Sequence, residues 1–208
     1  MQSKVDAPCP QCHEDGALSM LAMSSEIPYF GEHTQITVIC ESCGWKHTDF
    51  IPSDGEKPGY SSLVVDNPEK ISARVVRSSS GTIRIPDLDL EVSPGGSSSG
   101  FVSNIEGVIS RFEDAVGSVM RGNSDDDKVL IASMELLEGL RKMKDGSSRF
   151  LIELLDPRGR SQIIHSDAII RELLEVEKQS LDMGPEVPVF DIRYIASGAR
   201  NSATESSI

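Results

Sequence analysis

Apolar residues recur with the period of a β-strand in two segments of the first fifty residues. Residues 17–23 and 34–40 alternate apolar and polar side chains, which is the pattern of strands with one buried face. The segment between them, IPYFGEH at 27–33, is apolar, but Pro28 and Gly31 interrupt strand pairing. We therefore expect two antiparallel strands joined by an apolar turn.

The strand period returns beyond a stretch that contains several Pro and Gly residues, 52–68, which we interpret as a linker. Residues 70–77 and 82–92 alternate again, and Pro86 predicts a bulge or a sheet edge within the second segment. The sequence PGGSSSG at 94–100 is typical of a flexible loop. A second, mainly β region is thus predicted.

A helical hairpin is predicted at about 103–145. Between 103 and 121, apolar residues follow i, i+3, i+4, i+7 spacing, and Ser103 is placed to cap the first turn. A second helix is expected over 124–144, because acidic residues lie in its first turn and basic residues in its last. The predicted fold class is therefore mainly β with an α insertion (α+β).

Beyond the hairpin the chain returns to strand-like patterns. Residues 150–155 and 161–164 flank the turn sequence DPRG and predict a β-hairpin. Residues 166–180 carry apolar residues in the helical period, so a further helix is expected there. Residues 187–195 predict a last strand, and the small, polar tail at 197–208 is expected to be flexible.

The four cysteines form two identical C-x-x-C pairs. Cys9 and Cys12 make up the first pair, and Cys40 and Cys43 follow after 27 intervening residues. Each pair places two thiolates on one tight turn, and two such turns complete a tetrahedral S4 shell with no position for a catalytic water. We predict one structural Zn²⁺, although iron also fits four thiolates. Redox-active or ordinary buried cysteines are disfavoured, because the pairs flank β-type sequence.

Histidines and aromatic residues lie close to the cysteine pairs. His13 and His47 are not expected to be ligands, since four thiolates already fill the shell. Tyr29 and Phe30 in the apolar turn, and Trp45 after the second pair, either close a small core or contact a partner protein. The residues themselves leave these two alternatives open.

The chain is strongly acidic, with a formal net charge of -13. This charge repels a phosphate backbone, so it argues against nucleic-acid binding and favours a basic protein partner. No window approaches the roughly 18 apolar residues of a membrane span, and the N-terminus has no signal-peptide pattern. We expect a cytoplasmic protein that does not bind a membrane.

None of the common catalytic motifs is present in the sequence, including the P-loop, the nucleophile elbow and the H-E-x-x-H helix. Asp87, Asp89 and Glu91 alternate along a predicted strand, but a solvated strand face explains them without a substrate. We therefore predict no catalytic residues, no small-molecule substrate and no enzymatic activity.

The order of these motifs resembles the ZPR1 zinc-finger family. C-P-Q-C, I-P-Y-F-G-E and C-E-S-C-G-W match the zinc-finger module, and the segments at 82–92, 100–111 and 150–159 also look like that family. The resemblance covers approximately Cys9 to Tyr194. Because only one copy of the module is present, the chain is most similar to the shorter, archaeal type.

The resemblance implies a zinc ribbon at 1–52 and, at 53–196, a double-stranded β-helix (jelly-roll-like) domain that carries the helical hairpin. It also implies binding to translation elongation factor 1-alpha, a GTPase, with a role in the folding or biogenesis of that factor. Two other functions stay open. One is a nucleic-acid-binding zinc ribbon of the transcription-factor type, which the net charge disfavours, and the other is an enzyme with a pocket in the β-domain, which rests on fold analogy.

Overall fold

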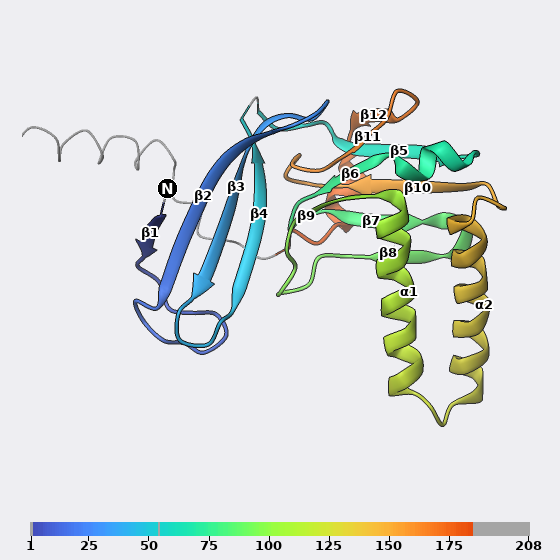
Figure 1. Ribbon diagram of the computed structural model, residues 1–208, viewed down its shortest axis with the longest axis horizontal. Coiled ribbons are helices and arrows are strands. Elements are labelled where there is room, and N and C mark those ends of the chain that lie inside the picture. Colours follow the sequence, from blue (N-terminus) through green and yellow to red (C-terminus); the bar gives the residue numbers. More distant parts are fainter. Residues whose placement is uncertain (1, 54, 185–208) are drawn as a thin grey trace, which may run out of the picture.

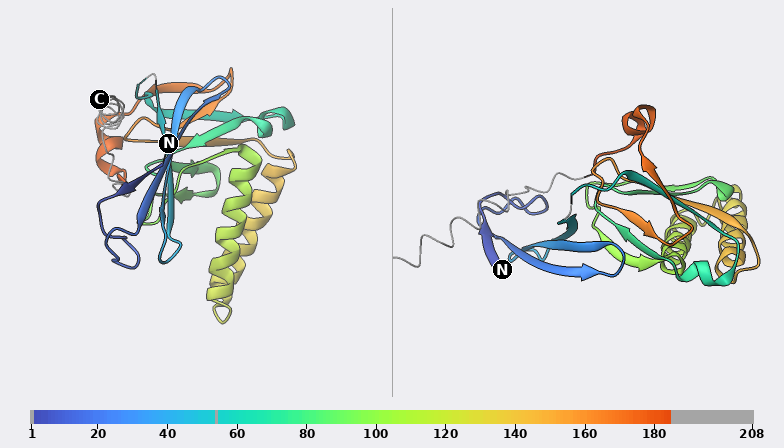
Figure 2. Two further views of the ribbon diagram at one scale, coloured as in Figure 1. Left: turned by 60° about the vertical axis from the view of Figure 1, so that its left-hand side comes forward. Right: turned by 90° about the horizontal axis from the view of Figure 1, so that it is seen from above.

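The computed structural model describes residues 2–53 and 55–184. Within this part, the chain is mostly β-strand with three α-helices, so the predicted α+β class is confirmed. Figure 1 shows one sheet at one end of the molecule and a second β region beside it, from which the long helices project. The view from above in Figure 2 places the first sheet and the two helices at opposite ends of the molecule.

The first sheet is antiparallel, with strand order β1-β2-β3-β4. Its strands are β1 (Gln2–Val5), β2 (Leu18–Ile27), β3 (Gly31–Cys40) and β4 (Lys46–Pro52). The two strands that alternation predicts are β2 and β3, and they pair along their whole length, from Leu18 opposite Cys40 to Ile27 opposite Gly31. Buried apolar residues of the sheet form one cluster with Cys9 and Cys40. The small core of this sheet therefore forms around the cysteine pairs.

The second region consists of two antiparallel sheets, one with strand order β12-β5-β10-β7-β8 and one with order β11-β6-β9. The strands are β5 (Gly59–Val65), β6 (Arg74–Arg77), β7 (Thr82–Ile85), β8 (Leu90–Val92), β9 (Phe101–Asn104), β10 (Phe150–Leu155), β11 (Gln162–Ile164) and β12 (Ile169–Glu172). One hydrophobic core contains Leu63 and Ile152 from the larger sheet and Val75 and Ile163 from the smaller. Two sheets that share a core in this way form a sandwich of the jelly-roll kind.

The predicted helical hairpin consists of α1 (Ile105–Gly122) and α2 (Asp127–Lys144). The N-cap of α1 is Asn104 rather than Ser103. Asn104 has the extended backbone of an N-cap, and its side chain accepts a hydrogen bond of 2.9 Å from the N–H of Gly107.

No described helix combines the length and the apolar character needed to cross a bilayer.

Two interpretations of the region between 52 and 92 are wrong. Residues 59–65 are not part of a linker, because they form β5, which pairs with both β10 and β12. The neighbouring Pro and Gly residues obscured this buried strand. Residues 82–92 are not one strand with a bulge, because Pro86 begins a 3-10 turn, Pro86–Leu88, and β8 folds back along β7. Proline ends the ladder there, as its missing N–H requires. The alternative expectation of a sheet edge agrees with β8, which is the last strand of its sheet.

Two interpretations near the C-terminus are also wrong. β11 does not return along β10 as a hairpin, because β10 pairs with β5 and β7 whereas β11 pairs with β6 of the other sheet. The helix expected at 166–180 is a strand in its first half, β12, which covers the edge of β5, and only α3 (Glu175–Ser180) is helical. Pairing with an otherwise open sheet edge outweighs a short helical period. The strand predicted at 187–195 and the tail at 197–208 lie outside the described residues.

Candidate metal centre and partner surface

The two cysteine pairs lie on turns of the same backbone form. In the first turn the N–H of His13 donates to the carbonyl of Cys9 at 2.8 Å, and in the second the N–H of Gly44 donates to the carbonyl of Cys40 at 3.0 Å. Both donor residues have a left-handed backbone, with φ of 61° for His13 and 75° for Gly44. Glycine adopts this conformation without steric cost, whereas histidine does not. The two turns thus present their thiols in the same way.

The four thiols converge at one end of the first sheet. The Sγ atoms of Cys9 and Cys43 are 3.7 Å apart, as are those of Cys12 and Cys40. All four sulfur atoms lie within 4.8 Å of one another, and the cysteines are free rather than disulfide-bonded. Four sulfur atoms at about 2.3 Å from a tetrahedral zinc ion are about 3.8 Å apart. Two of the spacings therefore match a tetrahedral zinc site, and the chain holds a four-cysteine site able to bind one Zn²⁺.

The surroundings of the thiols also suit a metal site. Cys9 and Cys40 are buried in the core of the first sheet, whereas Cys12 and Cys43 are exposed. Burial raises the pKa of the Cys9 thiol, but backbone N–H groups outweigh that effect and lower its pKa to about 7. One of these groups is the N–H of Gln11, 3.4 Å from the sulfur atom. The thiolate that zinc requires therefore forms at Cys9 near neutral pH. At Cys12 and Cys43, backbone N–H donors lower the pKa, but desolvation and the neighbouring thiols together outweigh them and raise the pKa of both thiols, so zinc must displace the protons there.

Trp45 follows the second cysteine pair and packs against the core of the first sheet. Its ring stacks on the ring of His47, with centroids 6.0 Å apart and an interplanar angle of 14°. His47 is buried, and this burial lowers its pKa, so the neutral imidazole is favoured. The group of potential ligands that the described structure brings together contains the four cysteines, without His13 or His47. The contacts of Trp45 are those of a residue that closes a small core.

The apolar turn between β2 and β3 places its two aromatic rings in opposite environments. Phe30 is 3% exposed and clusters with Ile27 and with Val76 of β6, so it joins the first sheet to the second region. Tyr29 is 91% exposed. Its φ of 66° lies in the left-handed region, which is costly for a residue with a Cβ atom. Of the two neighbouring rings, only that of Tyr29 is free to meet another molecule.

Two acidic side chains flank the apolar turn that carries Tyr29. Glu26 and Glu32 lie directly opposite each other on β2 and β3, and both are exposed. No ion pair to either carboxylate is found among the residues that the structure describes. Like charges in this position destabilise a strand pair. We call residues 26–32 the ribbon tip.

A recess of about 440 Å³ adjoins the ribbon tip. Tyr29 forms one wall, and the remaining lining residues come from β11 and the segment that follows it: Gln162, Ile164, His165 and Ser166. The ribbon tip and the second region therefore meet at a surface that carries an exposed aromatic ring, two carboxylates and a concavity.

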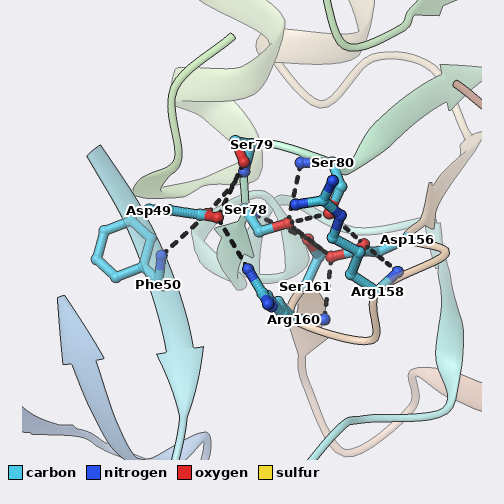
Figure 3. Close-up of polar contacts among 9 residues, drawn as sticks. All are labelled: Asp49, Phe50, Ser78, Ser79, Ser80, Asp156, Arg158, Arg160 and Ser161. Carbon is cyan, nitrogen blue, oxygen red and sulfur yellow. Dashed lines mark hydrogen bonds and ion pairs between the residues drawn. The ribbon is translucent and has the colours of Figure 1, made fainter. Parts of the chain in front are cut away.

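A buried polar cluster joins the two parts of the molecule, as Figure 3 shows. Asp49 of β4 accepts hydrogen bonds of 2.9 Å from both the N–H and the hydroxyl of Ser79, and it pairs with Arg160 at 3.2 Å. Asp156 accepts hydrogen bonds from three serine hydroxyls, those of Ser78 at 2.7 Å, Ser80 at 2.6 Å and Ser161 at 2.5 Å. The serines and both aspartates are buried. We call this group the serine–aspartate cluster.

The serine–aspartate cluster could not be predicted from the sequence. The run Ser78–Ser80 and the turn at Asp156 were visible in the sequence, but nothing local indicates that they meet. Each carboxylate oxygen of Asp49 and Asp156 accepts at least two hydrogen bonds, and the backbone N–H groups of Phe50, Arg158 and Arg160 complete the set. A fully satisfied buried network makes a structure rigid. The cluster therefore fixes β4 against the second region.

Two family models match the chain: the ZPR1 zinc-finger domain at residues 3–54 and the ZPR1 jelly-roll domain at residues 69–179. An uncharacterized ZPR1-like protein of Pyrococcus horikoshii is 33% identical over 183 residues, which cover 87% of this chain and 82% of the relative. One of Methanocaldococcus jannaschii is 36% identical over 173 residues, 82% of this chain and 86% of the relative. The zinc finger chaperone zpr1 of Schizosaccharomyces pombe is 27% identical over 166 residues, 77% of this chain but 34% of the relative. The chain therefore belongs to the ZPR1 family.

Proposed function

We propose that this chain is a zinc-stabilised, chaperone-like adaptor that binds translation elongation factor 1-alpha and assists its folding or biogenesis. A role in protein folding is supported by the yeast relative, which is named a zinc finger chaperone. The elongation factor as partner follows from the resemblance to the ZPR1 family. A cytoplasmic location belongs to the same proposal, because translation factors are made in that compartment.

The chemistry of the cysteine site supports a structural role for zinc. Four thiolates close the coordination shell, so water and substrate have no position on the metal. The serine–aspartate cluster does not supply a catalytic site either, because it is buried and its carboxylates are saturated with hydrogen bonds. We therefore place the function on the surface of the molecule, where a partner protein can reach it.

The observation that carries the proposal is the exposure of Tyr29 in a strained backbone. A left-handed residue with a side chain costs about 1–2 kcal/mol, and the opposed carboxylates of Glu26 and Glu32 add repulsion at the same turn. The turn itself accounts for the positive φ, because the N–H of Phe30 donates to the carbonyl of Ile27 at 3.0 Å and encloses Tyr29, but the fold gives no reason for a large, exposed ring at that position. An exposed tyrosine is a common anchor of protein interfaces, and the two carboxylates complement a basic partner surface.

Synthesis of elongation factor 1-alpha in the presence and absence of the zinc-loaded chain tests this proposal. We expect the chain to co-purify with the newly made factor and to raise its soluble yield, and we expect higher salt to weaken the complex. If the chain neither captures the factor nor raises its yield, the partner assignment fails.

Two variants locate the contact. Tyr29→Ala should reduce capture of the factor, whereas Met134→Ala, which removes another exposed apolar side chain on α2, should not. Neither residue lies among the thiols, so both variants should retain one zinc ion per chain. Equal loss of capture in both variants would place the contact away from the ribbon tip.

A further inference from the structure

A second recess, of about 460 Å³, lies where the loop at 93–100 meets β9 and α1. Two arginine side chains meet at this recess over a single aromatic ring. The guanidinium carbon of Arg111 is 4.2 Å from the ring centroid of Phe101, and that of Arg77 is 5.7 Å from the same centroid. In a chain of net charge -13, two cations at one ring are an unusual concentration of positive charge.

Neither arginine at this recess has a direct carboxylate partner within the part of the chain that the structure describes. Arg77 is 5% exposed and donates to uncharged oxygen atoms, namely the carbonyl of Gly81 at 2.8 Å, the hydroxyl of Ser98 at 3.2 Å and the carbonyl of Ser99 at 3.4 Å. A guanidinium group has five N–H donors. Two N–H donors of Arg77 therefore have no acceptor among the residues that the structure describes.

The balance of charge around Arg77 favours a further anion. Burial lowers the pKa of Arg77, and the like charge of Arg111 lowers it further, whereas Asp156 and Asp49 act in the opposite direction. Asp49 and Asp156 already accept hydrogen bonds from the serine–aspartate cluster. Asp114, on the next turn of α1, also lines the recess and opposes an incoming anion. The recess thus holds two cations against one local carboxylate.

We propose that this recess binds a phosphate-type oxyanion, either inorganic phosphate or the phosphate group of a phosphorylated small molecule. Guanidinium groups bind such oxyanions through paired N–H donors. Ser98 also lines the recess and adds a hydroxyl donor to the two guanidinium groups, and donors from three side chains suit a tetrahedral oxyanion better than a planar carboxylate. The hydroxyl of Ser93, another lining residue, already donates to Glu91 at 2.7 Å. The volume is in the range of small-molecule sites. This inference does not rest on the elongation-factor proposal.

A titration of the zinc-loaded chain, followed by amide NMR signals, tests the site. Sodium phosphate, adenosine 5′-monophosphate and sodium acetate are added separately at constant ionic strength. We expect the signals of Gly95 and Ser98 to shift and saturate with phosphate or with the monophosphate. If the signals saturate with phosphate and with adenosine 5′-monophosphate, free phosphate is sufficient for binding. If they saturate with the monophosphate alone, the site binds phosphorylated molecules. Saturation with neither, or with acetate equally well, overturns the proposal.

Three variants of α1 make the test specific. Arg111→Gln should weaken binding about tenfold, since it removes a charged donor. Asp114→Asn should tighten binding about threefold, because it removes an opposing charge, and a variant that had merely lost its fold could not bind more tightly. Arg121→Gln, a surface arginine in the last turn of the same helix, is the matched control and should bind as the original chain does. Unchanged binding by Arg111→Gln, or equal weakening by Arg121→Gln, refutes the site.

Discussion

His13 and Gly44 occupy equivalent positions in the two cysteine turns, although only one of them is a glycine. Each donates its N–H to the carbonyl of the first cysteine in its pair, and each has a positive φ. A left-handed backbone costs a non-glycine residue about 1–2 kcal/mol, so the first turn forms at a greater cost than the second. The hydrogen bond to the carbonyl of Cys9 holds His13 in this conformation.

Replacing His13 by glycine should therefore stabilise the zinc-loaded protein. The gain in free energy of unfolding should be about 0.5 kcal/mol, because relief of strain exceeds the entropy that glycine adds to the unfolded chain. Thermal unfolding in excess zinc measures the change. Gln11→Gly, in the same turn but without a positive φ in the original chain, is the control and should lower the unfolding midpoint. A similar decrease for both variants would show that His13 is not strained.

At the scale of elements, the helical hairpin is held at one end. α1 buries side chains between Ile105 and Val116, and α2 buries Leu140 and Met143 near its C-terminal end. Lys144 at the end of α2 pairs with Glu113 of α1 at 2.9 Å. The far ends of the helices project from the sheets in Figure 1 and expose three apolar side chains: Val119, Ile131 and Met134.

Truncation at the two ends of α2 should have unequal effects. Leu140→Ala should lower the free energy of unfolding by about 2–5 kcal/mol, because Leu140 is fully buried in the main core. Ile131→Ala, at a site that is 59% exposed on the same helix, should change it by less than about 0.5 kcal/mol. Denaturant unfolding monitored by circular dichroism gives both values. Equal effects would mean that the hairpin is not anchored at one end.

Elements with a strong local period could be predicted from the sequence, and those defined by distant pairing could not. β2, β3, α1 and α2 carry their signal within their own residues. β5, β12 and the separation of β10 from β11 depend on which strands pair, and alternation looks the same for every partner. A buried strand flanked by Pro and Gly, such as β5, also has little periodicity of its own.

The candidate site shows the same division. The metal site could be predicted because each C-x-x-C pair places two thiols on one turn, and two such pairs supply four metal ligands. The sequence of the turn does not indicate that Phe30 is buried and Tyr29 exposed, because Phe30 is buried by contact with Val76 of the second region. Asp49 meets Ser79 across 30 residues and Asp156 meets Ser78 across 78, so no local signal links them.

At the scale of the whole molecule, the contacts between the first sheet and the second region are of three kinds among the residues that the structure describes. Phe30 contributes apolar contact, and Asp49 contributes the serine–aspartate cluster. The backbone of Thr48 in β4 donates to the hydroxyl of Ser99 at 3.1 Å and accepts from the N–H of Gly100 at 2.7 Å. The ribbon tip therefore has a defined position beside β11, where Tyr29 adjoins the recess.

Asp49→Asn should loosen this junction. The variant keeps the shape of the side chain, but Arg160 loses its carboxylate partner and an amide group faces the donors of Ser79. This change should lower the free energy of unfolding by about 2–3 kcal/mol. Hydrogen exchange of the Ser79 and Phe50 amides should accelerate. Asp6→Asn, an exposed site in the same part of the chain, is the control. Unchanged exchange at both amides would show that Asp49 does not hold the two parts together.

Removal of the metal should affect the two parts unequally. Cys40→Ser should release zinc and unfold residues 9–50, since metal binding supplies folding free energy to such small modules. The second region should retain most of its structure, although Ser79 and Arg160 lose their partner. Metal analysis and hydrogen exchange report both outcomes. Unchanged zinc content, or cooperative loss of both parts, would contradict this division.

The affinity of the zinc-loaded chain for elongation factor 1-alpha, measured by titration before and after Tyr29→Ala, tests the central claim most directly. We predict that Tyr29→Ala weakens binding at least about tenfold, or about 1.4 kcal/mol, while zinc content stays the same and Met134→Ala binds as the original chain does. Equal affinities of the original chain and Tyr29→Ala would contradict the assignment of the ribbon tip as the partner surface.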